Sequence, residues 1–309
     1  MQSAVYKLHI SSRTCLYYKK TSLLFCSRRA IYYFCTMNIT SINTILFSPT
    51  GTSRKVALAV ADGLSLGNRI VDATYSTPSG VCYKSDELVI VAVPVYGGKV
   101  APLALQRIEA LQGNNTPIVL IAVYGNRAYE EALVQLDEFV RYRGFVPIAA
   151  GAFVGEHSYS TPQYPIAKGR PDATDLADAR AWGKSIGAKL AQIASPEAVN
   201  VASLKAPTNS FMSQLRFVNF IKEQRQVTAA AKPQVEVDAD KCKLCGKCAK
   251  LCPTGAIATG DYLHTDTSRC IKCCACVKGC PTKARTLNTP YAPVLSQCFG
   301  ERKSPVTIL

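Results

Sequence analysis

Two quartets of cysteines with identical spacing constrain this 309-residue chain more than any other feature. Each quartet follows the pattern C-x2-C-x2-C-x3-C-P, and the second repeats the first 28 residues later. The eight cysteines are Cys242, Cys245, Cys248, Cys252, Cys270, Cys273, Cys276 and Cys280. Each half is too short to hold a hydrophobic core by itself. We therefore expect two halves that fold around shared metal centres.

This spacing indicates iron-sulfur chemistry. The first three thiolates of each run bind one [4Fe-4S] cluster, and the fourth reaches the other cluster. One cluster is thus assigned to Cys242, Cys245, Cys248 and Cys280, and the other to Cys270, Cys273, Cys276 and Cys252. Structural zinc also uses C-x2-C pairs, but it gives no reason for two identical quartets that each end in Cys-Pro. Cys274 is in register with the spacer Gly246, so we do not expect it to be a ligand.

Residues 234–287 resemble a two-cluster bacterial-type ferredoxin, over all eight cysteines and both prolines. The resemblance implies single-electron transfer at low potential, with the two clusters as a relay. Free-standing clostridial ferredoxins are acidic, whereas residues 233–289 contain 9 basic and 5 acidic residues. Lysines interleaved with the ligands predict a solvated face, and such a face also suits an acidic redox partner protein.

The N-terminal residues 1–36 differ from the rest in charge. They contain six basic residues and no acidic residue, and so contribute 6 of the 15 positive charges in the formal net charge of +15. We treat them as a doubtful extension: either translation begins at Met37, or the segment is a targeting peptide without the apolar region of a secretory signal. No apolar run of the chain approaches the roughly 18 residues of a membrane span. No membrane-spanning helix is therefore expected.

From Thr44 onward, apolar runs alternate with helical stretches. Strands are predicted at 44–47, 70–73, 88–93, 118–123 and 146–153, and helices at 55–63, 102–111, 129–143 and 173–193. This alternation is typical of βαβ units, and so predicts an α/β domain with a doubly wound, five-stranded parallel sheet. In the last helix, apolar residues recur every three or four positions, which places Trp182 in the core.

The first strand leads through the sequence FSPTGTS into a helix. Its candidate anion-binding residues are Ser48, Thr50, Gly51, Thr52 and Ser53. A glycine among hydroxyls lets main-chain N–H groups approach an anion at the positive end of the helix. The loop has neither the GK[ST] ending of a P-loop nor a G-x-G-x-x-G motif, which disfavours an ATPase or an NAD site. The alternative is an ordinary turn with a serine cap.

In a doubly wound sheet, a ligand lies beyond the carboxyl ends of the strands. At that edge the third strand ends in Pro94, Tyr96 and Gly97, and the fourth ends in Tyr124, Gly125, Asn126 and Arg127. Residues 43–194 resemble flavodoxin. The resemblance implies FMN, with its phosphate on Ser48–Ser53 and its ring between the two tyrosine loops. Unlike flavodoxins, the chain has Arg54 and Lys55 after the phosphate loop, and its single tryptophan lies in a helix.

The predicted organisation has five parts. Residues 1–36 are the extension, 37–194 the flavodoxin-like domain, 195–233 a connector, 234–287 the small α+β ferredoxin domain and 288–309 a tail. The connector contains one predicted helix at 211–225, with Phe211, Leu215, Val218 and Ile221 on its packing face.

The order of these domains resembles flavodoxin-ferredoxin fusion proteins of anaerobic microbes, the ferrodoxin family. The resemblance implies a carrier that passes single electrons between two [4Fe-4S] clusters and FMN, with no catalytic base or nucleophile. The chain is long and has no secretory signal, unlike a secreted disulfide scaffold, so its cysteines indicate a reducing compartment and a cytoplasmic location is expected. An alternative is a flavin-dependent reductase of a small substrate, with His157, Tyr159 and Arg127 as the participants. A third possibility keeps the clusters and leaves the first domain as a docking module without flavin. Nucleic-acid binding is disfavoured, because no reading motif accompanies the basic charge.

Overall fold

The computed structural model describes residues 37–226 and 233–309. The expected extension at 1–36 and part of the expected connector lie outside the described residues. These described residues belong to one compact unit. Across the described ranges, no helix combines the length and the apolarity that a membrane crossing requires.

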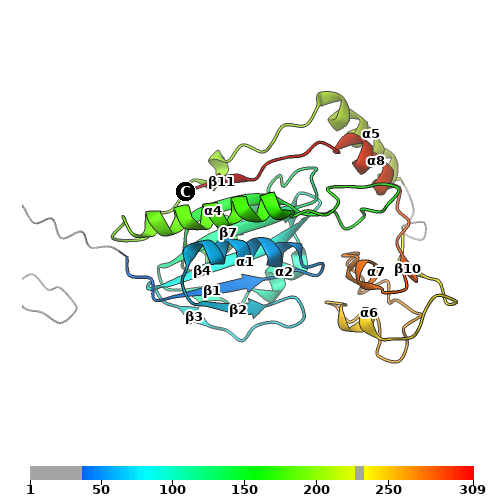
Figure 1. Cartoon of the computed structure of the whole chain (residues 1–309), viewed down its shortest axis with the longest axis horizontal. Coiled ribbons are helices and arrows are strands. Elements are labelled where there is room, and N and C mark those ends of the chain that lie inside the picture. Colours follow the sequence, from blue (N-terminus) through cyan, green and yellow to red (C-terminus); the bar gives the residue numbers. More distant parts are fainter. Residues whose placement is uncertain (1–36, 227–232) are drawn as a thin grey trace, which may run out of the picture. The chain divides into compact units, whose positions relative to one another are not determined.

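All five predicted parallel strands are present. They lie side by side in the order β2 (Asn68–Asp72), β1 (Ser41–Leu46), β4 (Glu87–Tyr96), β7 (Thr116–Tyr124) and β8 (Phe145–Val154). Counted along the chain, this is the order 2-1-3-4-5, which is the flavodoxin-like form of the doubly wound sheet. The predicted fold class is therefore confirmed (Figure 1).

The predicted strand count was too low, because the sheet has seven strands. Strand β5 (Lys99–Val100) forms an antiparallel hairpin with β4, and β11 (Val306–Ile308) pairs antiparallel with β8. Both additions are only two or three residues long, too short for a periodic signal in the sequence. Two further short strands, β3 (Cys82–Tyr83) and β6 (Gln112–Gly113), pair apart from the sheet.

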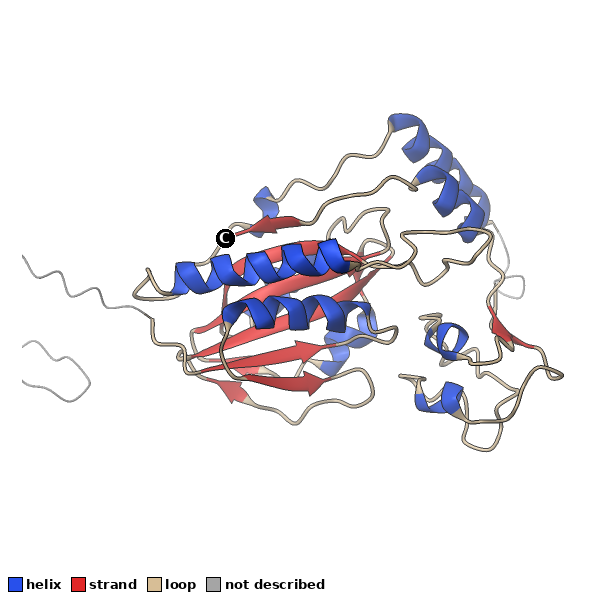
Figure 2. Ribbon diagram, viewed as in Figure 1, coloured by secondary structure: helices blue, strands red, loops and turns tan. Residues whose placement is uncertain are grey.

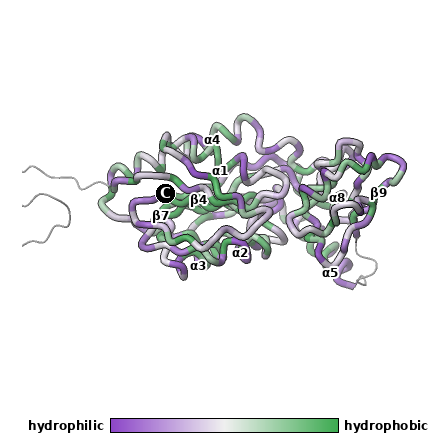
Figure 3. The backbone as a smooth tube through the Cα atoms, turned by 90° about the horizontal axis from the view of Figure 1, so that it is seen from below, coloured by the Kyte–Doolittle hydropathy of each residue, from purple (hydrophilic) through white to green (hydrophobic). Residues whose placement is uncertain are grey.

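Helices cover both faces of the sheet (Figure 3). Helices α1 (Thr52–Leu64) and α4 (Ala173–Leu190) cover one face, and α2 (Pro102–Arg107) and α3 (Ala132–Arg141) cover the other. Each face has its own hydrophobic core, and Trp182 lies in one of them with its ring centroid 5.7 Å from that of Phe153. The core position predicted for this tryptophan is therefore confirmed.

The cysteine-rich region repeats in structure as well as in sequence. It contains a small antiparallel pair, β9 (Glu236–Val237) and β10 (Arg285–Thr286), and two short helices, α6 (Lys247–Lys250) and α7 (Ala275–Gly279). Left-handed backbone recurs 28 residues apart in three pairs: Leu244 and Lys272, Gly246 and Cys274, Gly255 and Lys283. The first cysteine loop (residues 242–252) and the second cysteine loop (residues 270–280) therefore follow the same backbone path. Cys274 occupies the position that the spacer Gly246 has in the first loop.

Residues 288–309, predicted as a tail, are instead structured (Figure 2). They form α8 (Tyr291–Cys298) and β11, and α8 packs against the connector helix α5 (Phe211–Arg225). A short 3-10 helix, η1 (Val201–Ser203), precedes α5. The tail prediction failed because the segment gains its partners from distant parts of the chain, β8 and α5.

Helix α5 has the predicted bounds, but of the four predicted packing residues only Ile221 is partly buried. Phe211 is 75% exposed, and Leu215 and Val218 are also exposed. Phe217 and Phe220 pack instead, with ring centroids 5.4 Å from Phe299 and 5.1 Å from Tyr291 respectively. Because α8 was not expected, no pattern in the sequence favoured packing through Phe217 and Phe220.

Candidate functional site

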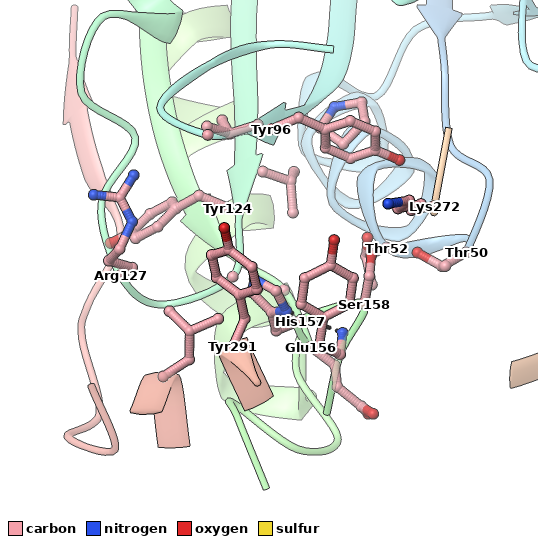
Figure 4. A pocket seen from close by; sticks show the side chains of 18 of the residues that line it. Thr50, Thr52, Tyr96, Tyr124, Arg127, Glu156, His157, Ser158, Lys272 and Tyr291 are labelled. Carbon is pink, nitrogen blue, oxygen red and sulfur yellow. Dashed lines mark hydrogen bonds between the residues drawn. The ribbon is translucent and has the colours of Figure 1, made fainter. Parts of the chain in front are cut away.

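A pocket of about 790 Å³ opens at the carboxyl ends of the central strands (Figure 4). The predicted cofactor residues that line it are Ser48, Thr50, Thr52, Ser53, Pro94, Tyr96, Gly97, Tyr124, Gly125 and Arg127. In Figure 4, Thr50 and Thr52 lie on one side of the pocket and Arg127 on the other. The structure thus brings together three loops whose residues lie 27 to 79 positions apart in the sequence. Of the predicted set, Gly51 and Asn126 are not among the lining residues.

The first loop has the local structure of an anion site. Gly51 caps α1 with φ 82°, a left-handed conformation that favours glycine, and α1 begins with no side-chain cap and no acid in its first turn. The Ser48 hydroxyl accepts a hydrogen bond from the Arg54 N–H at 3.0 Å, which closes the loop. Within the described chain, the buried Ser53 hydroxyl has no hydrogen-bond partner. An unpaired buried donor at a helix N-terminus fits a phosphate group.

The two tyrosine loops form the apolar part of the pocket. Burial raises the pKa of Tyr124, and its ring meets Tyr129 edge-on at 5.6 Å. Burial likewise raises the pKa of Tyr96, so both phenols stay neutral. Gly125 has no room for a side chain, because a Cβ there would lie 2.2 Å from Cδ2 of His157. These rings and tight turns fit a flat, largely apolar ligand.

His157 lies in the pocket wall with a defined tautomer. Its Nδ1 accepts a hydrogen bond from the Tyr159 N–H at 3.0 Å, so the proton of the neutral ring is on Nε2. Burial, together with the positive charges of Lys278 and Arg127, lowers the pKa of His157 to about 4. At neutral pH this side chain is an uncharged hydrogen-bond donor.

Asn126 has a structural role in place of the predicted contact with cofactor. Its side-chain amide donates to the carbonyl oxygens of Phe299 at 2.6 Å and Glu301 at 2.8 Å. Lys303, which is 8% exposed, donates to the carbonyl oxygens of Asn126 at 2.7 Å and Arg127 at 2.8 Å. The C-terminal segment therefore fixes the loop that follows β7.

Arg127 lines the pocket and is also held by its neighbours. Its guanidinium pairs with Glu130 at 2.5 Å and lies 5.2 Å from the ring centroid of Phe217 on α5. Arg127 is therefore both part of the pocket wall and one partner of an ion pair.

Several lining residues were missed by sequence reasoning. They come from α5, from the second cysteine loop and from α8: Phe217, Val218, Ile221, Lys222, Arg225, Ile271, Lys272, Tyr291 and Leu295. Two signals were available: Val218 and Ile221 lie on the predicted packing face of the connector helix, and at Lys272 the repeat replaces the Leu244 of the first loop with a cation. The others depend on packing that no local pattern records.

Four predicted ligands of one cluster meet around a small cavity. Cys252, Cys270, Cys273 and Cys276, which come from both halves of the repeat, line a space of about 20 Å³. Three of these thiols come from the second cysteine loop and one comes from the first. Four cysteine thiols in this arrangement are the donor set that a [4Fe-4S] cluster requires. Cys274 also lines this space, but its thiol lies 3.6 Å from the Lys272 carbonyl oxygen, which accepts its hydrogen bond.

The other predicted quartet lies nearer the surface. Cys242, Cys248 and Cys280 are partly buried, and Cys245 is exposed. Throughout the described ranges, all cysteines are free thiols, and no three His, Cys, Asp or Glu side chains are close enough together to hold a single metal ion.

Polar contacts attach both halves of the cysteine-rich region to the flavodoxin-like domain. Lys278 pairs with Glu156 at 2.6 Å, and Arg107 on α2 donates to the carbonyl oxygen of Pro253 at 2.9 Å. Burial alone raises the pKa of Glu156, but hydrogen bonds from Lys278 and the Gly169 N–H outweigh it and lower that pKa overall. The carboxylate is therefore charged at neutral pH, and the ion pair persists.

Comparison with known proteins identifies the cysteine-rich region. A 4Fe-4S binding domain model matches residues 235–258 and 263–286. No curated protein matches the chain. The chain thus joins a flavodoxin-like domain to a C-terminal 4Fe-4S ferredoxin domain, as in a flavodoxin-ferredoxin fusion.

Solved structures similar to the first domain have low identity. An archaeal flavodoxin is 15% identical, with 48% of this chain and 98% of that chain covered, at a TM-score of 0.32. Rubredoxin:oxygen oxidoreductase from Desulfovibrio gigas is 16% identical, with 49% and 36% covered, at 0.35. An azoreductase from Bacillus anthracis is 11% identical, with 50% and 99% covered, at 0.32. The fold assignment depends on the strand order and not on these likenesses.

Proposed function

We propose that this protein is an electron carrier that passes single electrons between two [4Fe-4S] clusters and one FMN. The observation that carries the proposal is the position of Lys272. This residue is next to the predicted ligand Cys273, and it lines the same pocket as the phosphate loop and the two tyrosine loops. A cluster held by that loop would lie beside a flavin held in that pocket.

Separate sets of residues would hold the flavin and the two clusters. Ser48, Thr50 and the unpaired Ser53 hydroxyl would bind the FMN phosphate, and Tyr96 and Tyr124 would flank its ring. The quartets headed by Cys242 and Cys270 would bind the clusters, as the sequence predicts. FMN accepts one or two electrons and clusters accept one, so the pair exchanges electrons one at a time. The Lys278–Glu156 ion pair would hold the distance between them constant.

The predicted domain boundaries form part of the proposal. Residues 37–194 would bind the flavin and 234–287 the clusters. The connector and the segment 288–309, with α5 and α8, would close one side of the pocket. Free thiols suit a reducing compartment, and we propose the cytoplasm.

A reductase of a small substrate is the second candidate. It is favoured by one observation: the pocket extends past the flavodoxin-like loops to Lys222 and Arg225 on α5. His157, with its proton on Nε2, would then donate a hydrogen bond to a substrate. Steady turnover of a small oxidant in the absence of a protein partner would favour this function over the carrier.

The test is a measurement of composition. The protein is produced from Met37 without oxygen, and iron, acid-labile sulfide and flavin are determined per chain. The proposal expects about eight iron, about eight sulfide and one FMN. If the protein contains iron but no flavin, even after incubation with FMN, the first domain would be a docking module without flavin. Zinc in place of iron would contradict the whole proposal.

A further inference from the structure

The two cysteine loops have the same backbone but opposite surroundings. In the second loop, Cys273 is 7% exposed and Lys272 lines the large pocket. At the equivalent positions of the first loop, Cys245 is exposed and Leu244 is 57% exposed. One loop of the repeat therefore faces the pocket, and the other faces solvent.

The basic residues of the two loops differ in the same way. In the second loop, Lys278 pairs with Glu156 at 2.6 Å and Arg269 donates to the Thr254 carbonyl oxygen. Lys278 and Arg269 therefore already have partners within the protein. The ten residues 241–250 contain four lysines and no acid, and all four lysines are exposed.

Three of these four lysines are available to a partner. Lys241 forms an ion pair with Asp238 at 2.6 Å. In the part of the chain that the structure describes, Lys243, Lys247 and Lys250 form no ion pair. Lys243 directly precedes Leu244, and Lys247 and Lys250 follow it three and six residues later. The segment therefore combines one exposed apolar side chain with three exposed lysines.

We propose that residues 241–250 form the docking surface for an acidic electron-transfer protein. The inference rests on the proposed function, and it adds where electrons enter or leave. A free patch of one charge raises the encounter rate with a partner of the opposite charge. Redox carriers exchange electrons through small, transient interfaces, and this segment offers an exposed leucine beside charged side chains. The relay would then run from partner to the Cys245 loop, the Cys273 loop and the pocket.

The electron balance of one encounter is simple. The reduced partner gives up one electron and is oxidised by one unit, and this chain gains that electron and is reduced by one unit. No bond forms or breaks, and no proton crosses the interface. The reverse reaction uses the same surface.

The test uses a purified acidic two-cluster ferredoxin of the clostridial type as the probe. One variant carries Lys243→Gln, Lys247→Gln and Lys250→Gln. The control variant removes three exposed lysines elsewhere, with Lys84→Gln, Lys184→Gln and Lys205→Gln. Stopped-flow absorbance gives the second-order rate constant of electron exchange at rising salt, and calorimetry gives the affinity of the two oxidised proteins. All variants are first matched for iron and flavin content.

The docking variant should lose about tenfold or more in rate constant at low salt, together with most of its salt dependence and its measurable affinity. The control should keep wild-type behaviour. A third variant, Leu244→Gln, should weaken the affinity without changing the slope against salt. Equal losses in docking and control variants would overturn the proposal, as would binding to anionic phospholipid vesicles but not to the ferredoxin.

The same samples separate this proposal from the function on which it rests. Dithionite supplies electrons without docking. If dithionite reduces clusters and flavin equally in all variants while the docking variant exchanges electrons with the ferredoxin at the wild-type rate, the docking surface is wrong and the carrier function stands. If the wild-type chain contains no flavin, the carrier function fails independently.

Discussion

At the scale of single residues, the Ser53 hydroxyl gives the clearest test of flavin binding. It is buried at the start of α1 and has no hydrogen-bond partner among the described residues. Ser53→Ala should weaken FMN affinity about tenfold, which corresponds to about 1.4 kcal/mol for one lost hydrogen bond. Quenching of flavin fluorescence measures this affinity.

The same substitution should have the opposite effect without flavin. An unsatisfied buried hydroxyl costs free energy, so the flavin-free Ser53→Ala variant should be as stable as the wild type or more stable. Ser185→Ala, on the exposed face of α4, is the control and should change neither quantity. A loss of stability without a loss of affinity would show that Ser53 serves the fold and not the phosphate.

His157 predicts a pH dependence. Its pKa is lowered to about 4 by burial, so the unfolded chain binds a proton more readily between about pH 4 and pH 6.5. Acid therefore favours the unfolded state, and up to about 2 kcal/mol of unfolding free energy should be lost between pH 7 and pH 5. Urea denaturation followed by circular dichroism measures it.

His157→Asn is the matched variant for this effect. It retains an acceptor for the Tyr159 N–H but carries no titratable group. The variant should lose less stability over the same pH range than the wild type. Equal losses in the two proteins would show that the histidine is not the group responsible.

At the scale of elements, helices α5 and α8 form a pair that the sequence did not predict. Phe217 meets Phe299 edge-on at 5.4 Å and also contacts Arg127. Phe217→Ala should cost about 1 to 3 kcal/mol of unfolding free energy, because it removes a partly buried ring and opens the pocket wall. Chemical denaturation provides the measurement.

Phe211 supplies the control on the same helix. This ring is 75% exposed, so Phe211→Ala should change stability by less than about 0.5 kcal/mol. FMN affinity should fall only in the Phe217 variant, whose side chain lines the pocket. If the two variants were equally destabilised, the packing face of α5 would be the one first predicted.

The cysteine quartets make a further prediction at this scale. Cys252→Ala removes the crossed ligand of the cluster beside the pocket, so iron should fall from about eight to about four per chain. Cys274→Ala, at the neighbouring spacer position, should leave the iron content unchanged. Loss of iron in the Cys274 variant, or none in the Cys252 variant, would contradict the assignment.

Features that depend on local sequence could be predicted, whereas features that depend on contacts between distant segments of the chain could not. Strands β4 and β7 are continuous apolar runs, and the cysteine spacing of the 4Fe-4S binding domain is local, so the strands and this domain could be predicted. The docking of α5 on α8 and the addition of β11 depend on contacts between distant segments. Asn126 belongs to the same class: it was predicted to face the cofactor, but carbonyl oxygens more than 170 residues away bind its side chain.

At the scale of the whole molecule, the central claim is that clusters and flavin exchange electrons within one chain. The second cysteine loop is the element that makes this possible. It carries three of the four predicted ligands of one cluster, lines the flavodoxin-like pocket through Lys272, and is attached to the pocket wall through the ion pair of Lys278 with Glu156. Electron transfer through such a contact requires no collision between molecules.

Laser-flash photoreduction of the loaded protein, with less than one electron delivered per chain, tests this claim most directly. Cluster and flavin absorbance are followed at several protein concentrations. We expect flavin reduction to follow cluster reduction at a rate independent of concentration, to persist in Cys274→Ala and to be lost in Cys252→Ala. A rate proportional to protein concentration, or one unchanged in Cys252→Ala, would contradict the account.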